Sequence, residues 1–195
     1  MKKRRLGING PQISAIGFGA MSITGFFGAT DTPTAQRCMA AAVDQGIDFF
    51  DTADIYGAGL SENLIGQFLR ETGANIKIAT KTGIQTQPVR QFNNAKDYIS
   101  ASLDASLKRL GVDYVDLFYI HRREADRPIE EVVETLKGLI DQGRIGGYGL
   151  SEVSPTTLRR AQAVHPCMAV QNEYSLWTRM PDLGLIRTCA ELGVA

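Results

Sequence analysis

The chain has 195 residues, of which 44% are hydrophobic and 22% are charged. This composition is ordinary for a globular protein with one sizeable core. Lys plus Arg and Asp plus Glu number 21 each, so the formal net charge of zero points to neither a nucleic-acid nor a membrane partner. The three cysteines, Cys38, Cys167 and Cys189, lack a metal-like spacing and are predicted to be free thiols in the cytoplasm.

The first predicted element is a hairpin, because Asn9-Gly10 is a strong signal for a two-residue turn between segments 5–8 and 12–14. Short apolar runs then alternate with helical patterns. The predicted strands are 15–19, 47–50, 76–80, 115–120, 145–150 and 168–171. The predicted helices are 32–45, with Thr32 as N-cap, then 61–72, 96–110, 128–142, one that begins at Ser154-Pro155, and 181–192.

This alternation predicts a parallel α/β architecture with right-handed crossovers. Residues 17–22, which span the end of the first strand, lack the third glycine of a dinucleotide-binding loop, and this disfavours a doubly wound sheet. A (β/α)8 TIM barrel fits better, although its eight units need about 250 residues. We therefore expect residues 1–195 to form a single barrel domain of about six units, truncated at the start of strand seven. Its two open edges favour self-association.

Polar side chains follow three of the predicted strands. Asp51 and Tyr56 come after the second strand, Lys81 after the third and His121 after the fourth. Strand ends of a parallel barrel share one rim, so we expect these four side chains to converge. A free phenol is a weak acid at neutral pH, and a nearby ammonium favours its ionised form. The set suits proton delivery to a carbonyl oxygen, and it includes no metal ligand set.

Each of these residues alone has an ordinary structural interpretation. Asp51 can cap a turn, Tyr56 can be a packing residue, Lys81 a solvated charge and His121 a structural histidine. Their joint occurrence at strand ends favours an active site. The charged run 122–127 is predicted to be a solvated loop with internal ion pairs, with a phosphate site as the alternative.

Several motifs resemble those of the aldo-keto reductases, particularly the long-loop branch of bacteria and plants. They are Asp51-Thr52-Ala53-Asp54-Ile55-Tyr56-Gly57, Lys81 at a strand end, Leu117-Phe118-Tyr119-Ile120-His121-Arg122, Gly17-Phe18-Gly19-Ala20-Met21 and Gly146-Gly147-Tyr148-Gly149-Leu150-Ser151-Glu152. The resemblance implies a (β/α)8 barrel that reduces a small aldehyde or ketone with NADPH, or with NADH as the alternative. It makes Tyr56 the general acid and His121 the group that orients the carbonyl. Lys81 and Asp51 form the ion pair that adjusts the pKa of the Tyr56 phenol.

The resemblance also implies a cofactor site. It assigns the nicotinamide contacts to Gly19, Ala20, Met21, Asp51, Ser151, Glu152 and Gln171. Glu152 departs from the family pattern, in which many members have Asn, and a carboxylate donates no hydrogen bond unless it is protonated.

Substrate contacts are expected from Tyr56, His121, Phe27 and Trp177. For Phe26-Phe27 the alternatives are a lid over the substrate and packing on the rim of the barrel. For Trp177 and Arg179 they are a pocket wall and ordinary loop packing with a solvated arginine. A binding or regulatory subunit derived from an enzyme, and an inactive barrel fragment, are the alternatives to a reductase.

Overall fold

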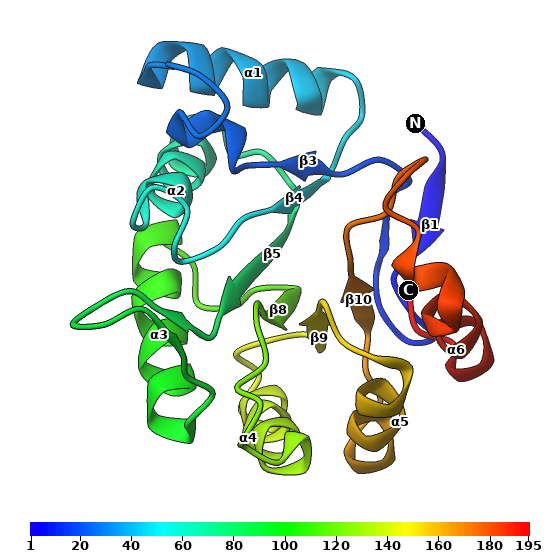
Figure 1. Cartoon of the computed structure of the whole chain (residues 1–195). Helices are drawn as coiled ribbons and strands as arrows, with labels where there is room; N and C mark the ends of the chain where they lie inside the picture. Colours follow the sequence, from blue (N-terminus) through cyan, green and yellow to red (C-terminus); the bar gives the residue numbers. More distant parts are fainter.

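Six short strands form a parallel sheet that curves through the centre of the molecule (Figure 1). The computed structural model describes residues 1–195. Across the sheet the strands follow one another in chain order, as in a barrel, with no reversal of direction as in a doubly wound sheet. They are β3 (Phe18–Gly19), β4 (Phe49–Asp51), β5 (Lys77–Thr82), β8 (Leu117–Ile120), β9 (Tyr148–Ser151) and β10 (Ala169–Gln171).

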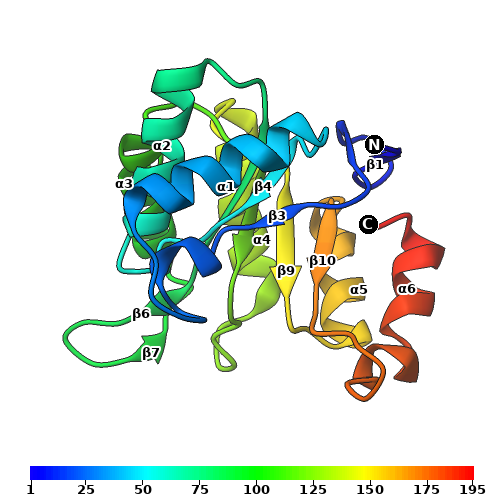
Figure 2. The same cartoon turned by 90° about the horizontal axis from the view of Figure 1, so that it is seen from above.

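Helices cover the convex, outer side of this sheet (Figures 1 and 2). They are α1 (Thr32–Asp44), α2 (Leu60–Thr72), α3 (Lys96–Leu110), α4 (Ile129–Asp141), α5 (Pro155–Val164) and α6 (Leu185–Leu192), with short 3-10 helices η1 (Ser22–Thr24) and η2 (Met180–Leu183). The prediction of Thr32 as the first N-cap is wrong. Asp31 takes that role, because its extended backbone lets Oδ1 accept a hydrogen bond of 2.8 Å from the Thr34 amide.

The two faces of each strand have different environments, because successive side chains point to opposite sides of a sheet. On β8, Phe118 and Ile120 pack with the helices, whereas Leu117 and Tyr119 face inward. Lys81 is paired in register with Tyr119, and it therefore lies on the inner face. If the register of β5 slipped by one residue, Lys81 would face the helices. The apolar pattern that sets the register of these strands therefore also places the Lys81 side chain on the inner face.

An antiparallel hairpin of β1 (Lys3–Arg5) and β2 (Gln12–Ser14) packs against the inner face of the sheet. Its buried Leu6 and Ile13 share a cluster with inward-facing residues of four strands of the sheet. The predicted two-residue turn at Asn9-Gly10 is wrong, since residues 6–11 form the connection. Gly7 approaches the backbone of Met168 so closely that a Cβ would lie 2.6 Å from that carbonyl oxygen. A side chain at this position would therefore clash with the sheet, which explains why the connection has glycine there.

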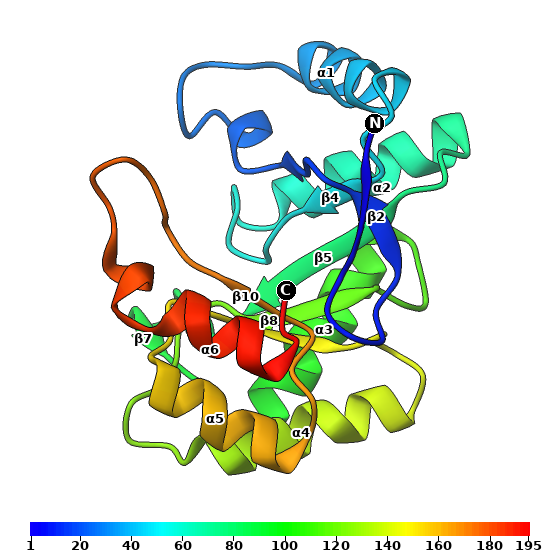
Figure 3. The ribbon, with the colours of Figure 1, turned by 90° about the vertical axis from the view of Figure 1, so that its right-hand side faces the viewer.

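The sheet forms six strands of a (β/α)8 barrel and remains open between β3 and β10 (Figure 1). Figure 3 shows the C-terminus beside β10. At the β10 edge, the amide of Val170 donates to the Ala195 carbonyl over 2.8 Å, and the Ala195 amide donates to Met168 over 3.1 Å. Ala195 therefore continues the hydrogen-bonding pattern of the sheet beyond β10. A second hairpin, β6 (Ile84–Gln85) with β7 (Gln91–Phe92), follows β5 and was not predicted. Figure 2 shows it projecting from the body of the protein.

Candidate active site

A cavity of about 580 Å³ lies at the carboxyl ends of the parallel strands. Its walls come from segments that are far apart in the sequence, namely the segments after β3, β4, β8, β9 and β10 and the hairpin β6–β7. Six of its lining side chains bear on the chemistry argued below: Tyr56, Arg90, His121, Arg122, Ser151 and Gln171. Because strand ends of a barrel converge on one rim, this is the face on which barrel enzymes carry their sites.

Lys81 is fully buried and joins two of the predicted site residues. Its Nζ lies 2.6 Å from Oδ2 of Asp51 and 3.4 Å from the phenol oxygen of Tyr56, and it donates to the carbonyl of Thr52 over 2.8 Å. The same ammonium lies 5.0 Å from the centre of the Tyr56 ring. A buried ammonium needs an opposite charge and hydrogen-bond acceptors, and these partners supply both. The phenol of Tyr56 is therefore next to a fixed positive charge.

His121 follows β8 directly and faces Tyr56. The two rings meet edge to face at a centroid distance of 5.7 Å. Burial, together with the positive charges of Lys81 and Arg122, lowers the pKa of His121 to about 3. Nδ1 is buried and has no hydrogen-bond partner. The imidazole is therefore neutral at physiological pH, and one of its nitrogens carries a proton that it can donate.

A second polar cluster lies on the opposite, helix-facing side of the sheet. Glu62 of α2 is buried and accepts hydrogen bonds from Thr80 over 2.5 Å and from Arg109 over 2.7 Å. Asp54 lies near this pair, and its amide donates to the Lys81 carbonyl over 3.1 Å. Burial and the charge of Glu62 raise the pKa of Asp54 to about 7. The turn that carries Tyr56 thus also contains Asp54, whose carboxyl group titrates near neutral pH.

Ser151, at the end of β9, accepts a hydrogen bond of 3.1 Å from Arg122, which also donates to the carbonyl of His121 over 2.6 Å. A guanidinium can only donate, so the Ser151 hydroxyl keeps its own proton for a partner in the cavity. The side-chain amide of Gln171 forms no hydrogen bond with the protein and also lines the cavity. These two side chains can hold a planar amide ligand, which needs both donors and acceptors.

Glu152 also lines the cavity, but its carboxylate is already engaged. Oε1 accepts a hydrogen bond of 2.7 Å from the Glu173 amide, and Oε2 accepts one of 3.1 Å from Asn172. The backbone of Glu152 is left-handed, with φ 54°. The position predicted to contact the nicotinamide therefore anchors the segment after β10.

Not all of the predicted site residues reach this cavity. Met21 lines it, but Gly19 and Ala20 do not, and Ala20 is buried with its carbonyl bonded to Ser61 over 3.0 Å. Phe27 is 73% exposed and lies outside the cavity, whereas the neighbouring Phe26 is part of the wall. Trp177 is 86% exposed and does not line it.

Sequence reasoning missed several cavity residues, among them Arg90 and Phe92 of the β6–β7 segment. The only local signal was the position of this segment directly after Lys81. The charged run 122–127 was predicted to be solvated and internally paired. Arg127 does pair with Glu124 at 2.9 Å, but Arg122 turns into the cavity.

No group of three or more His, Cys, Asp and Glu side chains in the chain could hold a metal ion. None of the helices combines the length and apolar character that a membrane crossing requires. The three cysteines are free, and a cytoplasmic location stays a prediction.

Comparison with known proteins gives a consistent result. The model of the aldo/keto reductase family matches residues 15–195. A protein of Glycine max named probable aldo-keto reductase 1 is 42% identical over 197 residues, which cover 97% of this chain and 56% of the relative. Aldo-keto reductase yakc of Schizosaccharomyces pombe, whose name includes NADP(+), is 41% identical over 94% of this chain and 56% of its own length. The chain thus spans about half the length of these relatives.

Solved structures with the same fold include an aldo-keto reductase of Bacillus halodurans, AKR11C1, in its holo form. It is 33% identical, with a TM-score of 0.89 over 100% of this chain and 64% of that one. The glycerol dehydrogenase AKR11B4 of Gluconobacter oxydans is 27% identical, with a TM-score of 0.90 over 99% of this chain and 61% of that one.

Proposed function

Because the chain belongs to the aldo/keto reductase family, we propose that it carries the active site of an NAD(P)H-dependent reductase that converts an aldehyde or a ketone to an alcohol. The observation that carries this proposal is the contact of the buried Lys81 ammonium with both Asp51 and the Tyr56 phenol. The presence of all four catalytic residue types favours an enzyme over a regulatory subunit with the same fold.

In the proposed reaction, Tyr56 donates its phenolic proton to the carbonyl oxygen while a hydride reaches the carbonyl carbon. The nearby charge of Lys81 stabilises the phenolate that remains, and Asp51 holds that charge in place. Neutral His121 donates an N–H to the same carbonyl oxygen and so orients it toward Tyr56. An imidazolium there would add a third positive charge beside Lys81 and Arg122, and burial opposes this.

A bound nicotinamide cofactor supplies the hydride. The Ser151 hydroxyl and the Gln171 amide fit the carboxamide of that group, because both line the cavity and both keep donors and acceptors that the protein does not use. Met21 lines the same cavity. NADPH is the proposed cofactor and NADH is the alternative.

Transfer of label tests the proposed reaction. The protein is incubated with an aromatic aldehyde and with NADPH that carries deuterium at both positions on C4 of the nicotinamide, and the product alcohol is analysed by mass spectrometry. Deuterium on the carbinol carbon is the expected result. Absence of the alcohol, or an alcohol without deuterium, would contradict hydride transfer from the cofactor.

A further inference from the structure

Two arginines line the same cavity as Tyr56 and His121, and neither is paired with a carboxylate. Arg122 uses Nη1 for the carbonyl of His121 and the hydroxyl of Ser151, which leaves its Nε and Nη2 groups without protein acceptors. Arg90 is exposed and forms no hydrogen bond or ion pair with the protein. A guanidinium has five donors, so each side chain retains groups for a ligand.

The two carboxylates in this cavity are in a different situation. Glu152 accepts hydrogen bonds from Asn172 and from the Glu173 amide, and Glu173 in turn accepts one of 2.9 Å from Thr178. Both carboxylates therefore stabilise the segment after β10. These neutral donors leave both carboxylates charged, so the cavity has no net positive charge, and what distinguishes the two arginines is that they keep charged donors that the protein does not use.

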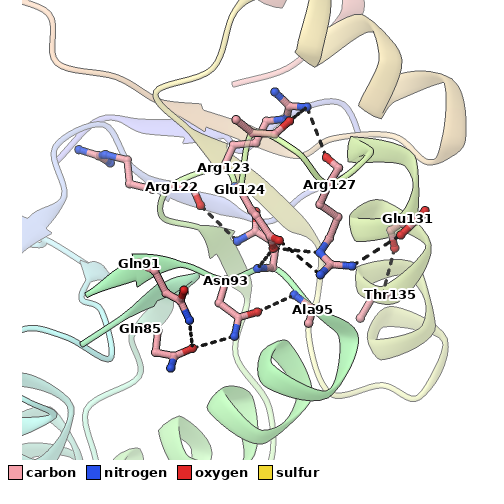
Figure 4. Close-up of polar contacts among 12 residues, drawn as sticks. Gln85, Gln91, Asn93, Ala95, Arg122, Arg123, Glu124, Arg127, Glu131 and Thr135 are labelled. Atoms are coloured by element: carbon pink, nitrogen blue, oxygen red, sulfur yellow. Dashed lines mark hydrogen bonds and ion pairs between the residues drawn. The ribbon is translucent and has the colours of Figure 1, made fainter. Parts of the chain in front are cut away.

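The segments that carry the two arginines are joined by hydrogen bonds (Figure 4). Asn94 is buried, and its amide donates to the Glu124 carboxylate over 2.7 Å while its Oδ1 accepts from the Glu124 amide over 2.8 Å. Nδ2 of Asn94 donates to the carbonyl of Arg122 over 3.2 Å. In Figure 4 the Arg122 side chain points away from this network.

The hairpin that carries Arg90 is held in the same way. Its Gln85 accepts hydrogen bonds from Gln91 over 3.3 Å and from Asn93 over 2.8 Å. Gly83, with φ 104°, leaves room for Asn94, because a Cβ there would lie 2.7 Å from Nδ2 of Asn94. The backbone positions of Arg90 and Arg122 are therefore held relative to each other.

We propose that this cavity takes a carbonyl substrate that also carries a carboxylate or phosphate group, and that Arg122 and Arg90 bind the anion. The inference rests on the proposed reduction at Tyr56 and names its substrate class. Arginine suits this task because its planar donors match the oxygens of carboxylate and phosphate. Phe92, on the same hairpin, supplies an apolar wall for the part of the substrate between the two groups.

The test compares 4-carboxybenzaldehyde with its neutral methyl ester, and 4-formylphenyl phosphate shows which anion fits better. The parent protein should have a higher kcat/KM for the acid than for the ester. Arg90→Met and Arg122→Met should each lower this ratio by at least about tenfold, since a hydrogen bond to a charged group is lost. Arg37→Met, on the exposed surface of α1, is the matched control and should keep the parent ratio. An acid-to-ester ratio that is unchanged in both cavity variants would overturn the proposal.

Calorimetry separates this proposal from the proposed reduction. If the acid binds more tightly than the ester but neither is reduced, the anion site stands and the reductase proposal is wrong. Equal affinities for acid and ester would overturn the anion site. A third arm measures NADPH affinity: if both variants weaken it and keep the acid-to-ester ratio, the arginines bind the cofactor's phosphates and the proposal is wrong. Arg90→Met provides the decisive comparison if Arg122→Met does not fold.

Discussion

The buried ammonium of Lys81 lies 3.4 Å from the phenol oxygen of Tyr56. The two residues come from different segments, β5 and the turn after β4, and they meet because both segments reach the same end of the sheet. Asp51, at 2.6 Å from the same nitrogen, completes a row of carboxylate, ammonium and phenol. This row underlies the first two predictions.

Replacement of Tyr56 by Phe removes the acidic proton and keeps the ring. We expect carbonyl reduction to slow by at least about 10²-fold, the lower end of what general acid catalysis contributes. Steady-state kinetics measures the loss, and fluorescence titration with NADPH should show an affinity within a few-fold of the parent. Turnover near the parent value would contradict the role of Tyr56 as proton donor.

Lys81→Met leaves the Asp51 carboxylate without its partner. Breaking a buried ion pair costs about 3 kcal/mol or more, and the partial exposure of Asp51 favours the lower end. We expect that loss in the free energy of unfolding, measured with urea, and recovery of part of it in the double variant Asp51→Asn/Lys81→Met. The exposed pair of Lys137 and Asp141 is the control, and Lys137→Met should cost much less. If Lys81→Met and Lys137→Met lost the same free energy of unfolding, burial would not account for the strength of the Lys81–Asp51 pair.

His121 is expected to stay neutral across the physiological range. Its pKa of about 3 in the folded protein lies below the ordinary 6.5. The unfolded chain therefore binds the extra proton first, and the folded state loses stability as pH falls from 6.5 toward 3. The NMR signals of the His121 ring should show no titration between about pH 5 and 8. A titration midpoint near 6.5 would show that the imidazole is not desolvated.

Asp54 should show the opposite pH dependence. Its pKa of about 7 in the folded protein lies above the ordinary 3.8, so the folded protein binds the extra proton between these values. The contribution of Asp54 to stability is therefore fully present below pH 3.8 and is lost as pH rises from 3.8 to about 7, above which it changes no further.

Asp54→Asn removes this titration. The variant should gain stability relative to the parent on going from about pH 5 to 8, by an amount on the order of a few kcal/mol. Chemical unfolding of both proteins at the two pH values measures the gain. A difference between variant and parent that does not change with pH would contradict the burial of an ionisable Asp54.

The open edges of the sheet predict self-association of a chain of these 195 residues. Strands β3 and β10 end the sheet, with only Ala195 paired beyond β10, and the apolar side chains of Leu176, Met180 and Leu183 in the segment after β10 are more than two-thirds exposed. Unpaired strand edges favour further pairing. Light scattering should give a mass that rises with concentration. A single monomer mass at all concentrations would show that these edges do not associate.

The amino-acid sequence determined the order of strands and helices, because apolar periodicity and the glycines at helix ends are local properties. Gly73 and Gly111, the residues directly after the predicted helices 61–72 and 96–110, end α2 and α3 in the left-handed conformation. The motif residues Asp51, Tyr56, Lys81 and His121 were likewise identified from their places after apolar runs. Parallel strands bring such positions to one rim, so their proximity followed from the fold class.

The tertiary structure alone decided which other side chains share the cavity. Arg122 belongs to a charged run that reads as solvated, and only the hydrogen bond with Ser151 shows that it turns inward. The Asn94–Glu124 contact joins segments that are 30 residues apart in the sequence. It holds the hairpin that carries Arg90 beside the segment that carries Arg122. Phe26 and Phe27 are adjacent and chemically identical, and only the path of the loop places the first at the cavity. Such contacts depend on loop conformation and on long-range hydrogen bonds, which leave no periodic pattern in a sequence.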